Sequence, residues 1–109
     1  MQGVATFHTR GLIGHVREFD DVTKVKVYAN YDYKNDNGDW VDNPHANTVT
    51  FFKGKTRDWV NANLGEGDHV EVFGRMRDDS YMKNGEKEFA TTFIAEKVTL
   101  IARKDRSSE

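Results

Sequence analysis

The segment NTVTFFKGKTRDWVNANLGEGDHVEVFG, residues 47–74, decides the fold because it places one helix pattern between two strand patterns. In the first strand pattern Val49 and Phe51 fall on one face, since neighbouring side chains of a strand point to opposite faces. Phe52 must then point the other way. The sequence therefore predicts that Phe51 lies in the core and that Phe52 lies on the surface, beside Lys53.

A short helix is predicted to follow this strand, over residues 56–68. Thr56 is expected to cap its N-terminus, and Gly65 is expected to end it. Residues 69–78 then alternate between apolar and polar side chains, which predicts another strand. The apolar residues expected to pack the helix are Trp59, Val60 and Leu64.

Further strand and turn patterns lie on both sides of this segment. Gly11 and Gly14 fall within the first strand pattern, and the strand is expected to bend at these glycines. Residues 34–45 are dense in turn-forming residues and predict a long loop, and Asn84-Gly85 predicts a hairpin turn. The strands predicted in addition to residues 69–78 span residues 5–16, 22–33, 46–53 and 87–102.

The predicted order is three strands, a short helix and a two-strand hairpin. Five strands in this order are typical of the OB-fold. We therefore predict an all-β protein: a five-stranded OB-fold Greek-key barrel, with one short helix between strands 3 and 4 and with extended β-hairpins. The barrel is expected to form one domain, residues 1–103, followed by a short charged tail, residues 104–109.

The composition excludes several classes of site. The 109 residues include no cysteine, so disulfides and thiolate zinc sites are excluded. The four histidines are scattered, without carboxylates at metal-ligand spacing, and no phosphate-binding or nucleophile motif is present. We therefore expect no metal, no cofactor, no small-molecule substrate and no enzymatic activity.

The charge and the apolar pattern limit the location and the ligand. No apolar run approaches the roughly 20 residues that span a bilayer, and the N-terminus MQGVATFHTRG lacks a signal-peptide core. A soluble cytoplasmic protein without membrane contact is expected. The net charge of −2 means that any anion-binding surface must be local.

Aromatic and cationic residues alternate on the faces that point away from the predicted core. Bases stack on aromatic rings for roughly 1–3 kcal/mol each while cations follow the phosphates, so this pattern predicts an interface for single-stranded nucleic acid. The rings are Tyr28, Tyr33, Phe52, Phe73 and Tyr81. The cations are Lys24, Lys26, Lys53, Lys55, Arg75, Arg77 and Lys83.

A structural interpretation of the same residues stays open. Small β-domains often leave aromatic rings partly exposed, and a charged face is usually a solvated face. Phe73 fits equally well against the helix or a partner subunit. The case for binding rests on the coincidence of rings and cations on three strands.

The second half of the chain resembles the bacterial single-stranded DNA-binding protein family. A valine-containing strand ends in an aromatic residue before a Gly/Lys step, and a short helix and the turn LGEGDHV follow. A V-x-V-x-G-x-x-R strand and the stretch NGEKEFATTF complete the similarity. In the first half, GLIGHV and VYANYDY are similar to the first two strands of the family.

This resemblance implies roles for particular residues. Phe52 falls at a stacking phenylalanine of the family, and Tyr81 and Tyr33 fall at stacking tryptophans. A further stacking tryptophan aligns near Ala46, so one platform is missing. Family members commonly carry a long tail with an acidic tip that recruits other proteins, whereas this chain ends in RKDRSSE.

The resemblance implies a protein that binds single-stranded DNA without sequence specificity and protects it during replication, recombination and repair. It also implies a homotetramer, with a dimer as the alternative, and a cytoplasmic, nucleoid-associated location. Two other functions stay open at this point. One is an OB-fold interaction subunit of a replication-restart or phage assembly with weak DNA affinity, and the other is a protein that mainly binds RNA.

Overall fold

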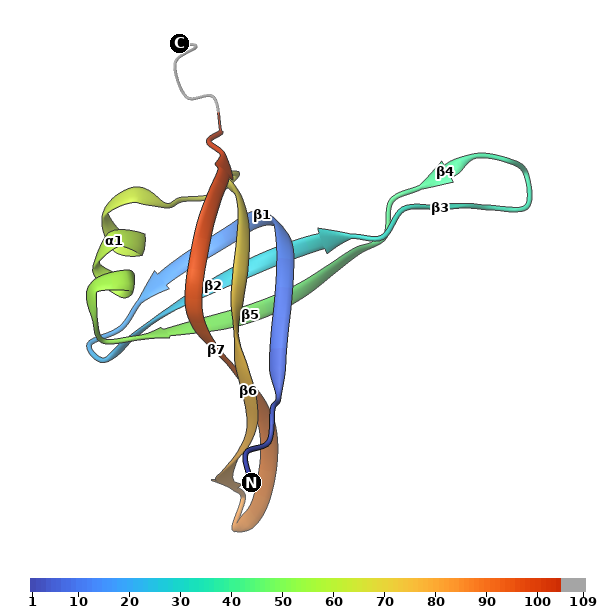
Figure 1. The fold of residues 1–109 in the computed structure, drawn as a ribbon. Helices are drawn as coiled ribbons and strands as arrows, with labels where there is room; N and C mark the ends of the chain where they lie inside the picture. The colour runs from blue at the N-terminus through green and yellow to red at the C-terminus, as the bar shows by residue number, and fades with distance from the viewer. Residues whose placement is uncertain (105–109) are drawn as a thin grey trace.

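The computed structural model describes residues 1–104, which form a mainly β fold with one short helix (Figure 1). This confirms the predicted mainly β class. The predicted tail, residues 104–109, lies outside the described residues except for Lys104. The elements are β1 (Thr6–Glu18), β2 (Val22–Asn30), β3 (Tyr33–Lys34), β4 (Trp40–Val41), β5 (Pro44–Phe52), α1 (Lys55–Asn63), β6 (His69–Lys83) and β7 (Glu86–Ala102).

Five strands close into a barrel in the order β1-β2-β5-β7-β6. All neighbours pair antiparallel except β5 and β7, which pair in parallel at Val49–Phe93 and Thr50–Ile94. β1 serves two neighbours: residues 6–12 pair with β6, and residues 12–18 pair with β2. The strand therefore changes partner near Leu12, between the two glycines at which a bend was predicted.

The barrel core is formed by the inward-facing residues that the alternation predicted. Val25 and Val27 from β2 are at most 1% exposed, as are Val49 and Phe51 from β5. β1, α1 and β6 close the core around these four residues. The remaining buried members of the cluster are Ile13, Val60, Leu64, Val70 and Val72.

Two arms extend from the barrel (Figure 1). The segment predicted as a long loop, residues 34–45, instead contains most of a small hairpin in which β3 pairs with β4. Its turn is closed by the Asn35 side chain, which accepts hydrogen bonds from the backbone of Asn37 and Asp39. The second arm is the outer part of β6 and β7, because β6 continues to Lys83 rather than ending at residue 78.

The helix was predicted in the right region, but both its start and its end were wrong, since it ends at Asn63 rather than at residue 68. α1 begins at Lys55, its N-cap is Gly54, and no side chain caps it, so Thr56 lies inside the first turn. Val60 packs into the core as expected, whereas Trp59 is 40% exposed. Among the described residues, no helix is long and apolar enough to cross a membrane.

Candidate nucleic-acid interface

The outer face of β2 and β5 carries the first group of predicted site residues. These two strands pair antiparallel in a regular register, so directly opposed side chains point to the same face. The inner members of the same strands fill the core, which leaves the alternate residues on the outer face, where Thr50 alone among the opposed pairs below is buried, at 7% exposed. The opposed pairs on the outer face are Val22 with Phe52, Lys24 with Thr50, Lys26 with Thr48, and Tyr28 with Ala46.

Phe52 lies at the end of this face, where β5 ends. Its side chain is 46% exposed, whereas Phe51 is 1% exposed, which confirms that the two rings point in opposite directions. Phe52 lines a cavity of about 410 Å³ between the β2–β5 face and the β6–β7 arm. The other residues around it are Val22, Lys24, Thr48, Thr50, Asp79, Ala90, Thr91, Thr92 and Phe93.

The predicted lysines carry uncompensated positive charge. Within residues 1–104, none of them forms an ion pair. The Nζ atom of Lys26 lies 5.6 Å from the centre of the Tyr28 ring, a distance at which a cation and an aromatic face attract each other. The lysines in question are Lys24, Lys26, Lys53, Lys55 and Lys83.

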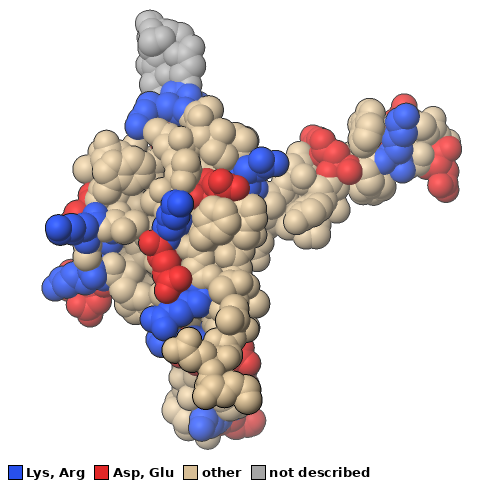
Figure 2. All heavy atoms as spheres, in the orientation of Figure 1, with Lys and Arg blue, Asp and Glu red and all other residues tan. Residues whose placement is uncertain are grey.

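The two predicted arginines differ from the lysines, because each has a carboxylate partner. Arg75 Nε lies 3.4 Å from Glu96 Oε2, and Arg77 Nε lies 3.0 Å from Asp79 Oδ1. Figure 2 shows the resulting surface, on which basic and acidic side chains lie next to each other. The free positive charge of the site therefore comes from the lysines more than from these arginines.

Tyr81 lies on the β6–β7 arm, on the same face as Asp79, because residues two apart in a strand share a face. It is 46% exposed, so its ring is accessible on the same wall that closes the Phe52 cavity. Tyr33 is also exposed, at 51%, but it belongs to β3, at the opposite end of the β2–β5 ribbon from Phe52 (Figure 1). The structure thus brings Tyr81 near the site and keeps Tyr33 on a separate arm.

Phe73 is not part of the Phe52 cavity. Its ring stacks on His8 of β1, with the ring centres 4.3 Å apart and the planes 2° apart. His8 Nε2 in turn lies 2.6 Å from Glu71 Oε2. The face of Phe73 toward β1 is thus already covered within this chain, which separates it from the other predicted platforms.

Two residues at the site were not predicted from the sequence. Phe19, in the turn between β1 and β2, is 45% exposed, and Lys24 Nζ lies 6.0 Å from its ring centre. Asp79 contributes a carboxylate to the wall of the cavity. An exposed aromatic residue beside the turn formers Asp20 and Asp21 was the signal for Phe19, and the i, i+2 spacing of Arg77 and Asp79 was the signal for the ion pair.

The electrostatic state of Asp79 is set by its neighbours. A hydrogen bond from the Thr92 hydroxyl, aided by the hydrogen bond and charge of Arg77, holds the pKa of Asp79 below its ordinary value despite partial desolvation. The carboxylate is therefore ionised throughout the neutral pH range. An ionised carboxylate only accepts hydrogen bonds, so this part of the cavity wall selects for donors.

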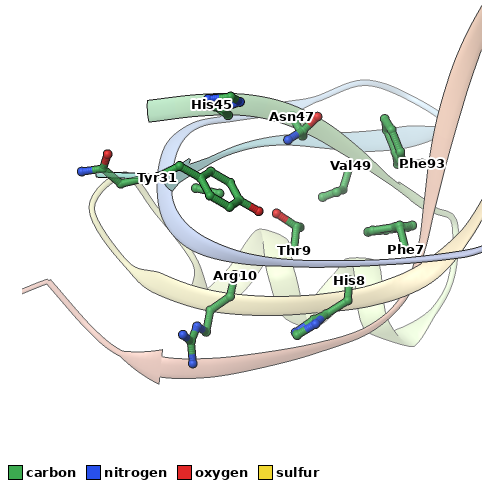
Figure 3. A pocket seen from close by; sticks show the side chains of 11 residues that line it. Phe7, His8, Thr9, Arg10, Tyr31, His45, Asn47, Val49 and Phe93 are labelled. Carbon is green, nitrogen blue, oxygen red and sulfur yellow. The ribbon is translucent and has the colours of Figure 1, made fainter. Parts of the chain in front are cut away.

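A second cavity, of about 720 Å³, lies at the open end of the barrel between β1 and the start of β5 (Figure 3). Phe7 and Thr9 point into it from β1, whereas His8 and Arg10 point away on the other side of the strand. Phe7 and Phe93 meet edge to face, with ring centres 5.4 Å apart. Above them, the Tyr31 ring reaches toward Thr9.

Among residues 1–104, no group of three or more histidine, aspartate or glutamate side chains is placed to hold a metal ion. The aromatic rings, lysines and Asp79 of the site offer stacking, charge attraction and hydrogen bonding.

Comparison with known proteins identifies the fold. No protein-family model and no curated protein matches the sequence. Solved structures do match, at low identity. A small single-stranded DNA-binding protein from Streptomyces coelicolor aligns with 17% identity and a TM-score of 0.67, covering 91% of this chain and 95% of that one.

Two further structures agree over nearly the whole chain. The Plasmodium falciparum single-stranded DNA-binding protein, in complex with single-stranded DNA, aligns with 15% identity and a TM-score of 0.72, covering 95% and 98% of the two chains. The mitochondrial protein Rim1 from S. cerevisiae aligns with 13% identity and a TM-score of 0.71, covering 94% of this chain and 100% of that one. The chain therefore has the fold of single-stranded DNA-binding proteins, as the sequence resemblance implied.

Proposed function

We propose that this protein binds single-stranded DNA, with low sequence specificity, along the outer face of β2 and β5. The observation that carries the proposal is the half-exposed Phe52 ring, which lines a cavity beside lysines that have no acidic partner. A base stacks on Phe52, and a neighbouring base stacks on Tyr81. Phosphates lie near Lys24, Lys26, Lys53, Lys55 and Lys83.

Further residues contribute in different ways. Tyr28 is partly exposed on the same face as Lys26 and supplies a third ring. Tyr33 supplies a further stacking ring only when the bound DNA strand is long enough to reach the β3–β4 arm. Arg75, Arg77 and Phe73 are engaged within the chain, so their contribution is smaller than that of the lysines.

The binding is expected to weaken as salt rises. For single strands the slope of log K against log salt is about −0.7 for each phosphate neutralised, so five lysines give a slope of roughly −3 to −4. Fluorescence anisotropy of a labelled mixed-sequence oligonucleotide, titrated at several salt concentrations, measures this slope. Absence of binding at micromolar protein in low salt would overturn the proposal.

Replacing Phe52 tests the stacking platform. Phe52→Ala is expected to weaken oligonucleotide binding about 10- to 100-fold, since a stacked base contributes roughly 1–3 kcal/mol. The matched control is Phe89→Ala, because Phe89 is 65% exposed on the opposite face of the β6–β7 arm. Equal dissociation constants for the two folded variants would show that Phe52 is not a platform.

The cellular role follows from the binding mode. A protein that covers single strands without chemistry of its own protects them during replication, recombination and repair, in the cytoplasm where the nucleoid lies. Competition between ribo- and deoxyribo-oligonucleotides of the same sequence separates this role from a main function in RNA binding.

We also propose that the protein is a homo-oligomer, a tetramer built from dimers or a dimer. Within the described residues, residues 6–11 of β1 pair with β6 along one edge, and no strand pairs with their other edge. That free edge borders the 720 Å³ cavity, whose floor includes Phe7 and Phe93. An unpaired edge next to these partly buried rings is a place where a second chain adds strands and buries apolar area. Light scattering measures the mass in solution.

A further inference from the structure

The Phe52 cavity has an acidic wall, which is unusual for a surface that receives a polyanion. Asp79 lines the same cavity as Phe52 and Lys24, and its side chain is 44% exposed. Arg77 offsets part of the charge of this carboxylate, but a phosphate diester offers only acceptors, and an ionised carboxylate needs donors. We therefore expect a base rather than a phosphate next to Asp79.

The carboxylate is held in place rather than left free to swing away. Arg77 Nε lies 3.0 Å from Asp79 Oδ1 and 3.3 Å from Oδ2, and the Thr92 hydroxyl donates a hydrogen bond to it. An ionised carboxylate has about four lone-pair sites, so acceptor capacity remains toward the cavity. The group is therefore an acceptor, held by Arg77, in the wall of the cavity that Phe52 also lines.

We propose that Asp79 makes this cavity prefer bases with an exocyclic amino group over thymine. The inference rests on the proposed function, since it concerns the base that stacks on Phe52. Carboxylates accept hydrogen bonds from the N4 amino group of cytosine, and adenine carries an equivalent donor at N6. Guanine offers a ring N–H and an amino group side by side.

Thymine fits the carboxylate less well. Its O4 atom is an acceptor, and its one ring N–H lies between two carbonyl oxygens. A carboxylate that accepts from this N–H therefore meets repulsion from the flanking oxygens. The preference is a moderate bias at one position within a generally unspecific mode of binding.

Homopolymers of cytosine and thymine test this base preference, because neither forms the ordered stacks or quadruplexes of purine strands. Labelled oligo-dC and oligo-dT of equal length are titrated with the protein at neutral pH and constant salt. Oligo-dC is expected to bind about tenfold more tightly, which is the scale of discrimination that one good base contact supplies. Equal affinity, or tighter binding of oligo-dT, overturns the inference while leaving the proposed function intact.

Asp79→Asn supplies the decisive variant, since an amide both donates and accepts and serves both bases alike. The ratio of the two affinities is expected to fall to about one. Asp78→Asn is the matched control, because it removes the same charge from the opposite face of the same strand, where Asp78 accepts from Thr91 Oγ1 at 2.9 Å. The control is expected to strengthen binding of both oligomers equally and to keep their ratio.

Two results reject the inference. One is an unchanged ratio in Asp79→Asn, and the other is an equal change of the ratio in both variants. Failure of the unmodified protein to bind either oligomer rejects the proposed function itself, and the inference with it.

Discussion

At the scale of single residues, Arg57 fixes the part of the chain that borders the candidate site. The residue is 9% exposed, and its guanidinium donates from Nε to Thr23 Oγ1 at 3.0 Å. It also donates to the backbone carbonyls of Phe19 and Asp20. Because Thr23 donates onward to Asn61 at 2.7 Å, one network joins α1 to the β1–β2 turn. The hydrogen bond from Arg57 to the Phe19 carbonyl thereby fixes the backbone that carries the exposed Phe19 ring.

Replacing Arg57 with methionine is expected to lower the free energy of unfolding by about 2–3 kcal/mol. The variant keeps most of the aliphatic volume but removes hydrogen bonds from a charged donor to partly buried acceptors, which are worth roughly 1.5–3 kcal/mol. Urea unfolding followed by circular dichroism measures the change. The exposed Lys55→Met on the same helix is the control, with an expected change within about 0.5 kcal/mol. Similar values for both variants would contradict this role.

Residue faces were predictable from the sequence where only strand alternation was needed. The opposite directions of Phe51 and Phe52 follow from their being neighbours in β5. The stack of Phe73 on His8 was not predictable, because it depends on the register between β1 and β6, which are distant in the sequence. Asp79 was not predicted either, because the strand pattern in the sequence ends at residue 78.

At the scale of elements, the first strand determines how tightly the barrel closes. Gly11 lies where a Cβ atom would come within 2.0 Å of the Tyr28 carbonyl oxygen. Gly14 instead faces the Tyr28 ring, and a Cβ atom there would lie 2.2 Å from Cε2. The first contact is with backbone that is fixed by strand pairing, and the second is with a side chain that is partly exposed. The two glycines therefore have different tolerance to change.

Gly11→Ala is expected to destabilise the protein more than Gly14→Ala. Forcing a methyl group against packed backbone costs roughly 1–3 kcal/mol, whereas the Tyr28 ring has solvent into which it can turn. Urea unfolding of both variants measures the difference, and Gly3→Ala is the control because no atom lies within 4 Å of its Cβ position. The reverse order of stability, or three equal values, would show that this close approach does not limit the fold.

Elements with clear alternation were predicted well, and elements that leave the barrel were not. β2 and β5 bury one face, so their sequence carries the pattern of the core. The β3–β4 hairpin and the outer part of β6 are exposed on both faces, so no apolar period marks them. The α1 cap was missed for a similar reason: Gly54 caps the helix through its backbone, without a side chain that signals it.

At the scale of the whole molecule, the distribution of charge and the unpaired strand edge determine where DNA and a second chain can bind. The net charge of −2 lets a strand of DNA bind only where cations lack partners, as along the outer face of β2 and β5. The barrel closes through a parallel contact of two residue pairs between β5 and β7. Among residues 1–104, no strand pairs with the adjoining edge of β1 along residues 6–11. No single segment of the sequence predicts this opening, because residues of β1, β2, β5 and β7 line it together.

Thr9→Arg tests whether a second chain covers this opening. Thr9 points into the cavity (Figure 3) and is not a member of the buried core, so a long charged side chain there would meet the proposed interface without replacing a core residue. The mass measured by light scattering is expected to fall from that of an oligomer to that of a smaller species.

Asn37→Arg, at the exposed tip of the β3–β4 hairpin, adds the same charge and is expected to leave the mass unchanged. Monomers in the unmodified protein, or full assembly of the folded Thr9→Arg variant, would refute association through this edge, because an interface built on the β1 edge has no room for a buried, unpaired guanidinium.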